Sequence, residues 1–203
     1  MLSINDIQTL LNPLAERYFQ KTSEPNLSSI YEEVFGMEEE QIAGLKKDII
    51  EKFGKPDVIW ASPPCTSYSI AAISHHRKRN PITGNLDPVS DFAKLSDNLV
   101  QHTIELIREL QPKYWFIENP RGGLRKMAFM KNLPRYTITY CQYGDTRMKP
   151  TDIWTNHPDP QFKPMCHNGD SCHQPAPRGS KTGTQGLKGA VERSVIPEKL
   201  CLH

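Results

Sequence analysis

The chain has 203 residues, of which 37% are hydrophobic and 24% charged, a balance that fits one globular domain with a sizeable core and a smaller appendage. The formal net charge of +2 neither demands nor excludes a nucleic-acid partner. No apolar run approaches the ~20 residues of a membrane span, and the first residues lack the form of a signal peptide, so we expect a cytoplasmic protein.

Residues 1–54 are predicted to form a helical N-terminal segment. Apolar residues recur at helical spacing over residues 3–20, where Pro13 is expected to kink the helix. A second helix is predicted over residues 38–53, because Gly54 is the type of residue that ends a helix.

Residues 55–157 are predicted to form a catalytic α/β core. The stretch PDVIWAS is a short apolar run typical of a parallel strand covered on both faces, and YWFIENP repeats this pattern. Between them, Ser90 is expected to cap a strong helix. Two successive strand–loop–helix units predict parallel strands with right-handed crossovers. The stretches YTITYCQYG and DIWTN add two short strands, for which antiparallel pairing is one arrangement.

Residues 66–90 show no periodic pattern and are predicted to be a long loop, which in a compact domain is usually functional or disordered. The run HHRKR at residues 75–79 offers basic side chains for gripping phosphates. A merely solvated charged loop would have the same composition, so both interpretations stay open.

Cys65 and Glu118 each lie just past the end of a predicted strand, at the edge where open α/β sheets bind ligands. An isolated cysteine is more often a small packed residue, and Glu118 alone would fit a solvated loop acid. Pro63 and Pro64, however, fix the backbone in front of Cys65 at a rigid corner. Such a corner favours a nucleophile over a core residue.

The paired motifs SPPCTSYS and ENPRGGLR resemble the DNA (cytosine-5) methyltransferase family, in particular its short phage and prophage members. The similarity is expected to run from about Asp48 to the C-terminus. The resemblance implies a Rossmann-like methyltransferase sheet and transfer of a methyl group from S-adenosyl-L-methionine to C5 of cytosine in DNA. Because that base lies inside a duplex, it must be flipped out, and a basic loop after the nucleophile is a suitable tool.

The resemblance also implies roles for individual residues. Cys65 would attack C6 of the cytosine, and Glu118 would hold N3 and the exocyclic amine. The reaction needs such a pair, because C6 is a poor electrophile and charge grows on the ring during attack. Arg147 and Lys149 stand where the family has Gln-x-Arg-x-Arg, with Thr151 in the place of the last arginine. The substrate-binding residues implied in this way are Pro63, Pro64, Asn119, Pro120, Arg147 and Lys149.

The family's glycine-rich turn, which holds the methionine end of the cofactor, has no counterpart in residues 1–47. The sheet is therefore expected to be truncated or altered in its N-terminal cofactor-binding half. Asp48 and Ile49 resemble the family's contact near the adenine. Three interpretations follow: a second chain supplies the cofactor half, the N-terminal helices build a shortened site, or the chain is an inactive remnant that acts as a nucleic-acid-binding module.

Residues 158–203 are predicted to be an irregular C-terminal segment rich in Cys, His and Gly. The chain has five cysteines and no export signal, which argues against a disulfide framework. Within CHNGDSCH, the candidate zinc ligands are Cys166, Cys172 and His173. Further candidates are His167, Cys201 and His203. The alternative is a polar loop with incidental thiols, because the two cysteines of CHNGDSCH are spaced more widely than is usual in zinc sites.

Overall fold

The computed structural model describes residue 47 and the ranges 50–52, 54–175 and 194–202. The chain divides into two compact units, Met1–Gly54 and Lys55–His203. In the first unit the described residues before Gly54 are helical, and Gly54 follows them with φ 76°. The helix predicted over residues 3–20, most of the one predicted over 38–53, and the candidate cofactor contacts Asp48 and Ile49 lie outside the described residues.

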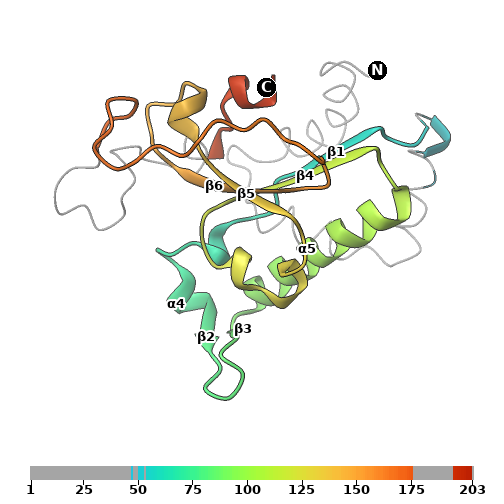
Figure 1. Ribbon diagram of the computed structural model, residues 1–203. Helices are drawn as coiled ribbons and strands as arrows, with labels where there is room; N and C mark the ends of the chain where they lie inside the picture. Colours follow the sequence, from blue (N-terminus) through green and yellow to red (C-terminus); the bar gives the residue numbers. More distant parts are fainter. Residues whose placement is uncertain (1–46, 48–49, 53, 176–193, 203) are drawn as a thin grey trace, which may run out of the picture. The chain divides into compact units, whose positions relative to one another are not determined.

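The second unit is built around a four-stranded sheet with the strand order β1-β4-β6-β5 (Figure 1). β1 (Val58–Ala61) and β4 (Tyr114–Pro120) run parallel, as the repeated apolar pattern predicts. β6 (Pro150–Thr155) is antiparallel to both β4 and β5 (Arg135–Thr139). The fold class is therefore α/β with a mixed sheet, consistent with part of the Rossmann-like sheet that the family resemblance implies.

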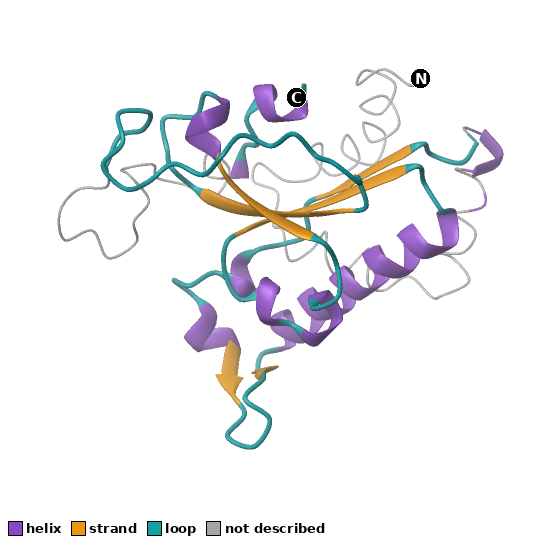
Figure 2. Cartoon of the chain, viewed as in Figure 1, coloured by secondary structure: helices purple, strands orange, loops and turns teal. Residues whose placement is uncertain are grey.

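The long helix α5 (Asp91–Leu110) covers one face of this sheet (Figure 2). Ser90 caps it as predicted, because its side-chain oxygen accepts a hydrogen bond from the Ala93 amide at 3.2 Å. Apolar side chains at helical spacing then face the strands. The core on this side includes Val100, Ile104, Ile107, Ile117 and Trp154.

The opposite face of the sheet is covered by η4 (Tyr140–Tyr143), by irregular chain after β6, and by α7 (Glu198–Cys201). Side chains alternate along a strand, so Ile153 faces this side while its neighbour Trp154 faces α5. The described residues 158–175 include no helix or strand. Phe162 nevertheless packs against this second core.

Residues 66–90 are more ordered than the predicted long loop. They form η1 (Thr66–Tyr68), α4 (Ile73–His76) and an antiparallel hairpin of β2 (Arg77–Arg79) and β3 (Leu86–Pro88), which extends away from the sheet in Figure 1. The prediction was wrong because strands of three residues are too short to show a period. Asn80 stabilises the turn, since its side-chain oxygen accepts hydrogen bonds from two backbone amides of the turn.

The predicted second strand–loop–helix unit contains no long helix. β4 is followed by η2 (Leu124–Lys126) and η3 (Ala128–Met130), because Gly122 and Gly123 disfavour a helix at that point. The strand predicted over YTITYCQYG ends at Thr139, where the chain turns into η4. Within the described part of the chain, no helix is long and apolar enough to cross a membrane.

Candidate active site

Cys65 lies at the corner where the chain leaves β1 and enters η1. It directly follows Pro63 and Pro64, and its backbone (φ −92°, ψ −11°) starts the 3-10 turn. Its side chain is partly exposed and is not in a disulfide. The thiol is therefore held on a fixed backbone and can be reached from outside.

Glu118 lies in β4 and is almost fully buried, with 5% of its surface exposed. The Tyr140 hydroxyl donates a hydrogen bond to Glu118 Oε1 at 2.7 Å. Burial raises the pKa of Tyr140 above its usual value, and the charge of Glu118 raises it further, so the tyrosine stays a neutral donor.

Two hydrogen bonds fasten the loop that carries Cys65 to the end of β4. The fully buried Asn119 donates from Nδ2 to the Pro63 carbonyl at 2.8 Å, and the Gly123 amide donates to the Tyr68 carbonyl at 2.7 Å. β1 and β4 are neighbours in the sheet, with Ala61 opposite Ile117. The loops that follow both strands consequently form one connected edge.

Gly122 and Gly123 allow this close approach. A Cβ atom at Gly122 would lie 2.5 Å from the Tyr68 carbonyl oxygen, and one at Gly123 would lie 2.8 Å from Ile73 Cδ1. Sequence reasoning did not assign these glycines a role. The signal was the consecutive pair directly after ENPR, since adjacent glycines often mark a close backbone approach.

Lys149 connects the two candidate catalytic groups electrostatically. Its ammonium group lies over the Tyr140 ring, 4.4 Å from the centroid. Burial lowers the pKa of Lys149, while the charges of Glu118 and Cys65 act in the opposite direction. Lys149 is thus a cation whose charge interacts with both groups.

Arg147 forms an ion pair with Asp145 of the same chain. Its guanidinium group is buried against Asp145, with Nε 2.9 Å from Oδ1, and Nη2 also pairs with Oδ2. Although burial acts to raise the pKa of Asp145, the hydrogen bonds and charge of Arg147 hold it below its usual value. Thr151 is fully buried in β6, so this position offers no surface to a ligand.

Comparison with known proteins identifies the family. Residues 8–137 match the family model of C-5 cytosine-specific DNA methylases. The chain belongs to this family. A probable DNA (cytosine-5)-methyltransferase of Frog virus 3 (isolate Goorha) is 35% identical, and the match covers 72% of this chain and 75% of the relative. The predicted family is thus confirmed, but the family match starts earlier than the predicted boundary near Asp48.

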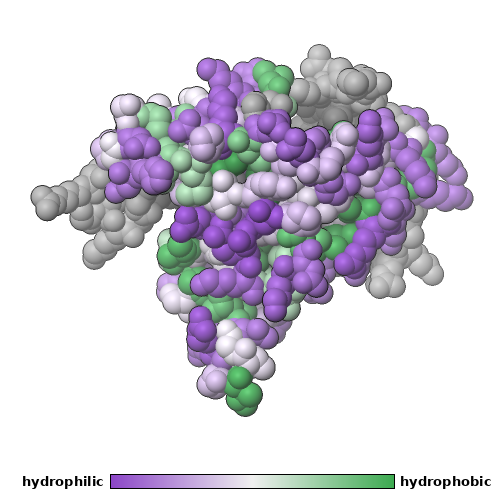
Figure 3. Space-filling view, in the orientation of Figure 1, coloured by the Kyte–Doolittle hydropathy of each residue, from purple (hydrophilic) through white to green (hydrophobic). Residues whose placement is uncertain are grey.

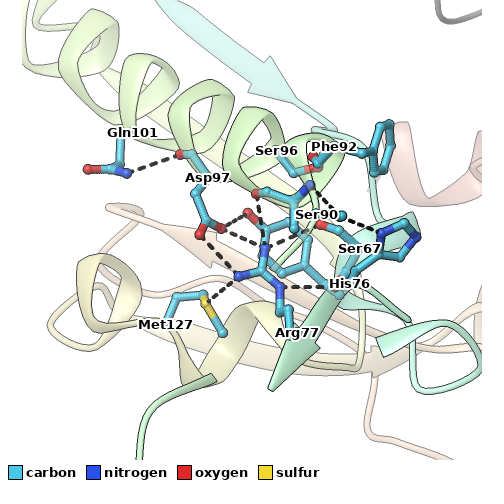
Figure 4. Close-up of polar contacts among 11 residues, drawn as sticks. Ser67, His76, Arg77, Ser90, Phe92, Ser96, Asp97, Gln101 and Met127 are labelled. Atoms are coloured by element: carbon cyan, nitrogen blue, oxygen red, sulfur yellow. Dashed lines mark hydrogen bonds and ion pairs between the residues drawn. The ribbon is translucent and has the colours of Figure 1, made fainter. Parts of the chain in front are cut away.

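In this member of the family, Arg77 from the basic run 75–79 is a structural residue (Figure 4). It is only 3% exposed, and its guanidinium group donates to both oxygens of Asp97 in α5, at 2.7 and 3.0 Å. It also bonds the Ser67 carbonyl at 3.0 Å and lies over the Tyr68 ring at 4.3 Å. Arg77 therefore anchors the hairpin and the turn after Cys65 to α5, and is not available to a phosphate.

The other basic residues of the hairpin face solvent. Lys78 and Arg79 are exposed, and Ile82 at the turn has 93% of its surface exposed. Figure 3 shows this apolar surface at the end of the hairpin, beside hydrophilic surface. Basic side chains around an exposed apolar tip suit contact with a nucleic acid more than packing within the chain.

A second cluster of reactive side chains lies beside η4. The side chains of Cys141, Cys166, Cys172 and His173 place one donor atom each within 4.8 Å of all the others. The last three are the residues that the sequence singles out, whereas Cys141 was missed because it lies far away in the sequence. Burial raises the pKa of Cys141 to about 12, and the neighbouring Cys166 raises it too.

The other candidate ligands lie elsewhere. His167 is an exposed side chain 3.9 Å from Asp170, and Cys201 is exposed in α7. Neither belongs to the cluster, and His203 lies outside the described residues.

The described residues do not form a recognisable cradle for S-adenosyl-L-methionine, the cofactor implied by the family. The consecutive glycines after β4 are closed off by the backbone of Tyr68. A hollow of about 310 Å³ lies between η4 and the chain before α7, lined by Tyr143, Asp145, Pro197 and Lys199 among others. Its lining contains no glycine-rich turn after a strand and so does not match the family's cofactor cradle.

Proposed function

We propose that this chain methylates C5 of cytosine in DNA, with Cys65 as the nucleophile. The observation that carries the proposal is the connection between the two motif loops, through Asn119 to Pro63 and through Gly123 to Tyr68. This connection keeps Cys65 and Glu118 at one edge of two neighbouring strands. A flipped-out cytosine needs both groups on the same side.

In the first step Cys65 Sγ forms a bond to C6 of the cytosine, and electron density moves from the C5–C6 bond toward C5 and N3. Glu118 binds the edge of the base that carries N3 and the exocyclic amine, and so favours a proton at N3 as charge develops. Tyr140 donates a hydrogen bond to Oε1 of Glu118. The tyrosine is thus a positioning residue for the carboxylate.

The later steps return the enzyme to its starting state. S-adenosyl-L-methionine, when bound, would supply the methyl group that C5 takes up, with S-adenosyl-L-homocysteine as the leaving group. A base then removes the proton from C5, and Cys65 leaves C6 as the double bond forms again. A thiolate suits both steps, because it is a strong nucleophile and a good leaving group.

The residues around this edge would bind the cytosine and its backbone. Three prolines would shape the backbone beside Cys65 and Glu118: Pro63, Pro64 and Pro120. Asn119 joins the two segments through its hydrogen bond to the Pro63 carbonyl. Lys149 brings a positive charge that interacts with both catalytic groups, where it would offset negative charge that develops during attack. Arg147 would act through Asp145, by shaping the turn that leads to Lys149.

The hairpin would meet the DNA. Lys78 and Arg79 would contact phosphates, and the exposed tip with Ile82 would support the opened duplex after the base leaves it. The buried Arg77–Asp97 pair would transmit the position of the hairpin to the turn after Cys65.

The methyl donor would be bound through Asp48 and Ile49, or by a half-site on a second chain. Titration calorimetry of the whole chain with S-adenosyl-L-methionine separates these cases. Binding that weakens in an Asp48→Ala variant supports a site in this chain. No binding by the chain alone would exclude autonomous methylation, and would leave the partner-dependent enzyme or the silent DNA-binding module.

The nucleophile is tested by covalent trapping. A long duplex in which 5-fluorocytosine replaces every cytosine presents all target sequences, and fluorine at C5 blocks the release of Cys65. With S-adenosyl-L-methionine present, we expect a denaturation-resistant complex for the wild type and for Cys201→Ser, the matched control for an exposed cysteine. Cys65→Ser should form none. An adduct in Cys65→Ser would refute the assignment of the nucleophile.

A further inference from the structure

We propose that Cys141, Cys166, Cys172 and His173 bind one structural Zn²⁺ ion, which fastens the C-terminal segment to the sheet beside the candidate active site. This metal site is independent of the methylation chemistry. It rests on the positions of four side chains that come from two separate parts of the chain, η4 and residues 166–173.

The separations of the donor atoms fit a tetrahedral ion. The Sγ atoms of Cys141 and Cys166 are 3.1 Å apart, and Cys172 Sγ is 3.6 Å from Cys141 Sγ. His173 Nδ1 lies 3.6 Å from the Sγ atoms of Cys166 and Cys172. Zinc bonds of about 2.3 Å to sulfur and about 2.0 Å to nitrogen put tetrahedral ligands about 3.5–3.8 Å apart. These four pairs lie within about 0.7 Å of the tetrahedral values and the remaining pairs are at most 4.8 Å apart, so side-chain shifts of about 1 Å would close the cluster around the ion.

Hydrogen bonds from the backbone hold the ligand loop in place, although residues 166–173 include no helix or strand. The Cys166 amide donates to Thr139 Oγ1 at 3.0 Å, and the Gln174 amide donates to the Thr146 carbonyl at 2.9 Å. These two bonds attach both ends of the ligand loop to the chain on either side of η4. Between them, the His167 amide donates to Asp170 Oδ2 at 2.7 Å and shapes the turn.

The donor set selects zinc over other occupants. Three thiolates and one imidazole form a closed Cys₃His set of the kind found in structural zinc sites, whereas Mg²⁺ and Ca²⁺ require oxygen ligands. A disulfide between Cys141 and Cys166 would account for only two of the four residues. Their sulfur atoms, at 3.1 Å, are also well beyond the roughly 2.05 Å of a disulfide bond.

The site has a place in the architecture of the fold. Residues 158–175 contain no regular secondary structure among the described residues, so few backbone hydrogen bonds hold them to the sheet. A metal ion supplies this cross-link. Cys141 directly follows Tyr140, whose hydroxyl bonds Glu118, so the ion also fixes the turn that positions the candidate catalytic acid.

Metal analysis tests the proposal on the wild-type chain. Protein expressed with added zinc and then desalted should carry about one zinc per chain, and Co²⁺ substitution should give the absorption of tetrahedral thiolate coordination. A strong chelator should lower the midpoint of thermal unfolding, and Zn²⁺ but not Mg²⁺ should restore it. Zinc-free protein whose unfolding midpoint is unaffected by the chelator would overturn the proposal.

Thiol reactivity gives a second test that needs no folded variant. In the native chain, Cys65 and Cys201 should react rapidly with a thiol reagent, and the other three cysteines only after chelation. If the denatured chain, kept from oxidation, has two thiols fewer than five, a disulfide is present and the zinc site is refuted. Cys172→Ser should lose zinc while Cys201→Ser keeps it; equal zinc in both would overturn the ligand assignment. The adduct between Cys65 and 5-fluorocytosine DNA is measured in a separate experiment. Failure of the zinc proposal can therefore be distinguished from failure of the proposed methylation.

Discussion

Replacing Tyr140 with phenylalanine removes one hydroxyl group and keeps the ring. The hydroxyl donates the 2.7 Å hydrogen bond to Glu118 Oε1, and both residues are buried. The ring's contact with Lys149 remains available in the variant. The substitution therefore removes the hydrogen bond to the Glu118 carboxylate, together with a weaker contact of the hydroxyl with Thr151.

The cost follows from the type of bond. A hydrogen bond to a charged group contributes roughly 1.5–3 kcal/mol, and a buried acceptor left without its donor loses that amount or more. In a chain of this size each kcal/mol lowers the unfolding midpoint by roughly 2–4 °C, so we expect a decrease of about 3–12 °C. Adduct formation with 5-fluorocytosine should slow as well, because the carboxylate loses its fixed orientation.

Thermal and urea unfolding of Tyr140→Phe provide the measurement. Tyr136→Phe is the matched control, since Tyr136 lies at the exposed side of β5 with 36% of its surface accessible, and its loss should cost less than about 0.5 kcal/mol. In a Glu118→Gln background, which removes the charge, Tyr140→Phe should cost less than in the wild type. Equal costs for the two tyrosines, or an unchanged cost in the Glu118→Gln background, would refute the reasoning.

Two further predictions concern the contacts that hold the Cys65 loop. Arg77→Met leaves the Asp97 carboxylate without its buried partner and should lower the free energy of unfolding in urea by about 3–5 kcal/mol. Lys78→Met, on the exposed side of the hairpin, should change it by less than about 0.5 kcal/mol, and similar values for both variants would contradict a structural role for Arg77. Gly122→Ala places a Cβ atom 2.5 Å from the Tyr68 carbonyl oxygen and should lower the free energy of unfolding by about 1–3 kcal/mol. It should also reduce the yield of the Cys65 adduct with 5-fluorocytosine DNA. Wild-type stability together with a wild-type adduct yield would show that the two loops need not touch.

The sequence was informative where local chemistry decides the structure. The apolar runs before Cys65 and through Glu118 gave the parallel pair β1 and β4, and Ser90 marked the start of α5. These features depend on side chains that lie within a few residues of one another. Cys65 was correctly placed just after a strand, whereas Glu118 was predicted just past a strand end and lies within β4, because the strand continues to Pro120 through its pairing with β6.

The sequence did not predict contacts between residues that lie far apart along the chain. Cys141 joins the cluster of Cys166, Cys172 and His173 only because η4 folds back over the sheet. Tyr140 reaches Glu118 through the antiparallel strands between them, and that pairing was only one of the arrangements open to the short strands. The buried role of Arg77 depends likewise on Asp97, which lies on another element. Composition cannot distinguish such an arginine from its exposed neighbours.

The candidate active site is held in place by contacts on both faces of the sheet, and this determines how stability and adduct formation should change when these contacts are removed. From the α5 side, Arg77 and Asp97 hold the turn after Cys65 through Ser67 and Tyr68. From the opposite side, η4 holds Glu118 through Tyr140. The side chains that make these contacts lie on opposite faces of a close-packed layer, so weakening one is expected to leave the other largely intact. Arg77→Met and Tyr140→Phe should therefore add in their effects on stability, yet each alone should impair trapping, because attack on the cytosine requires Cys65 and Glu118 to be in place at once.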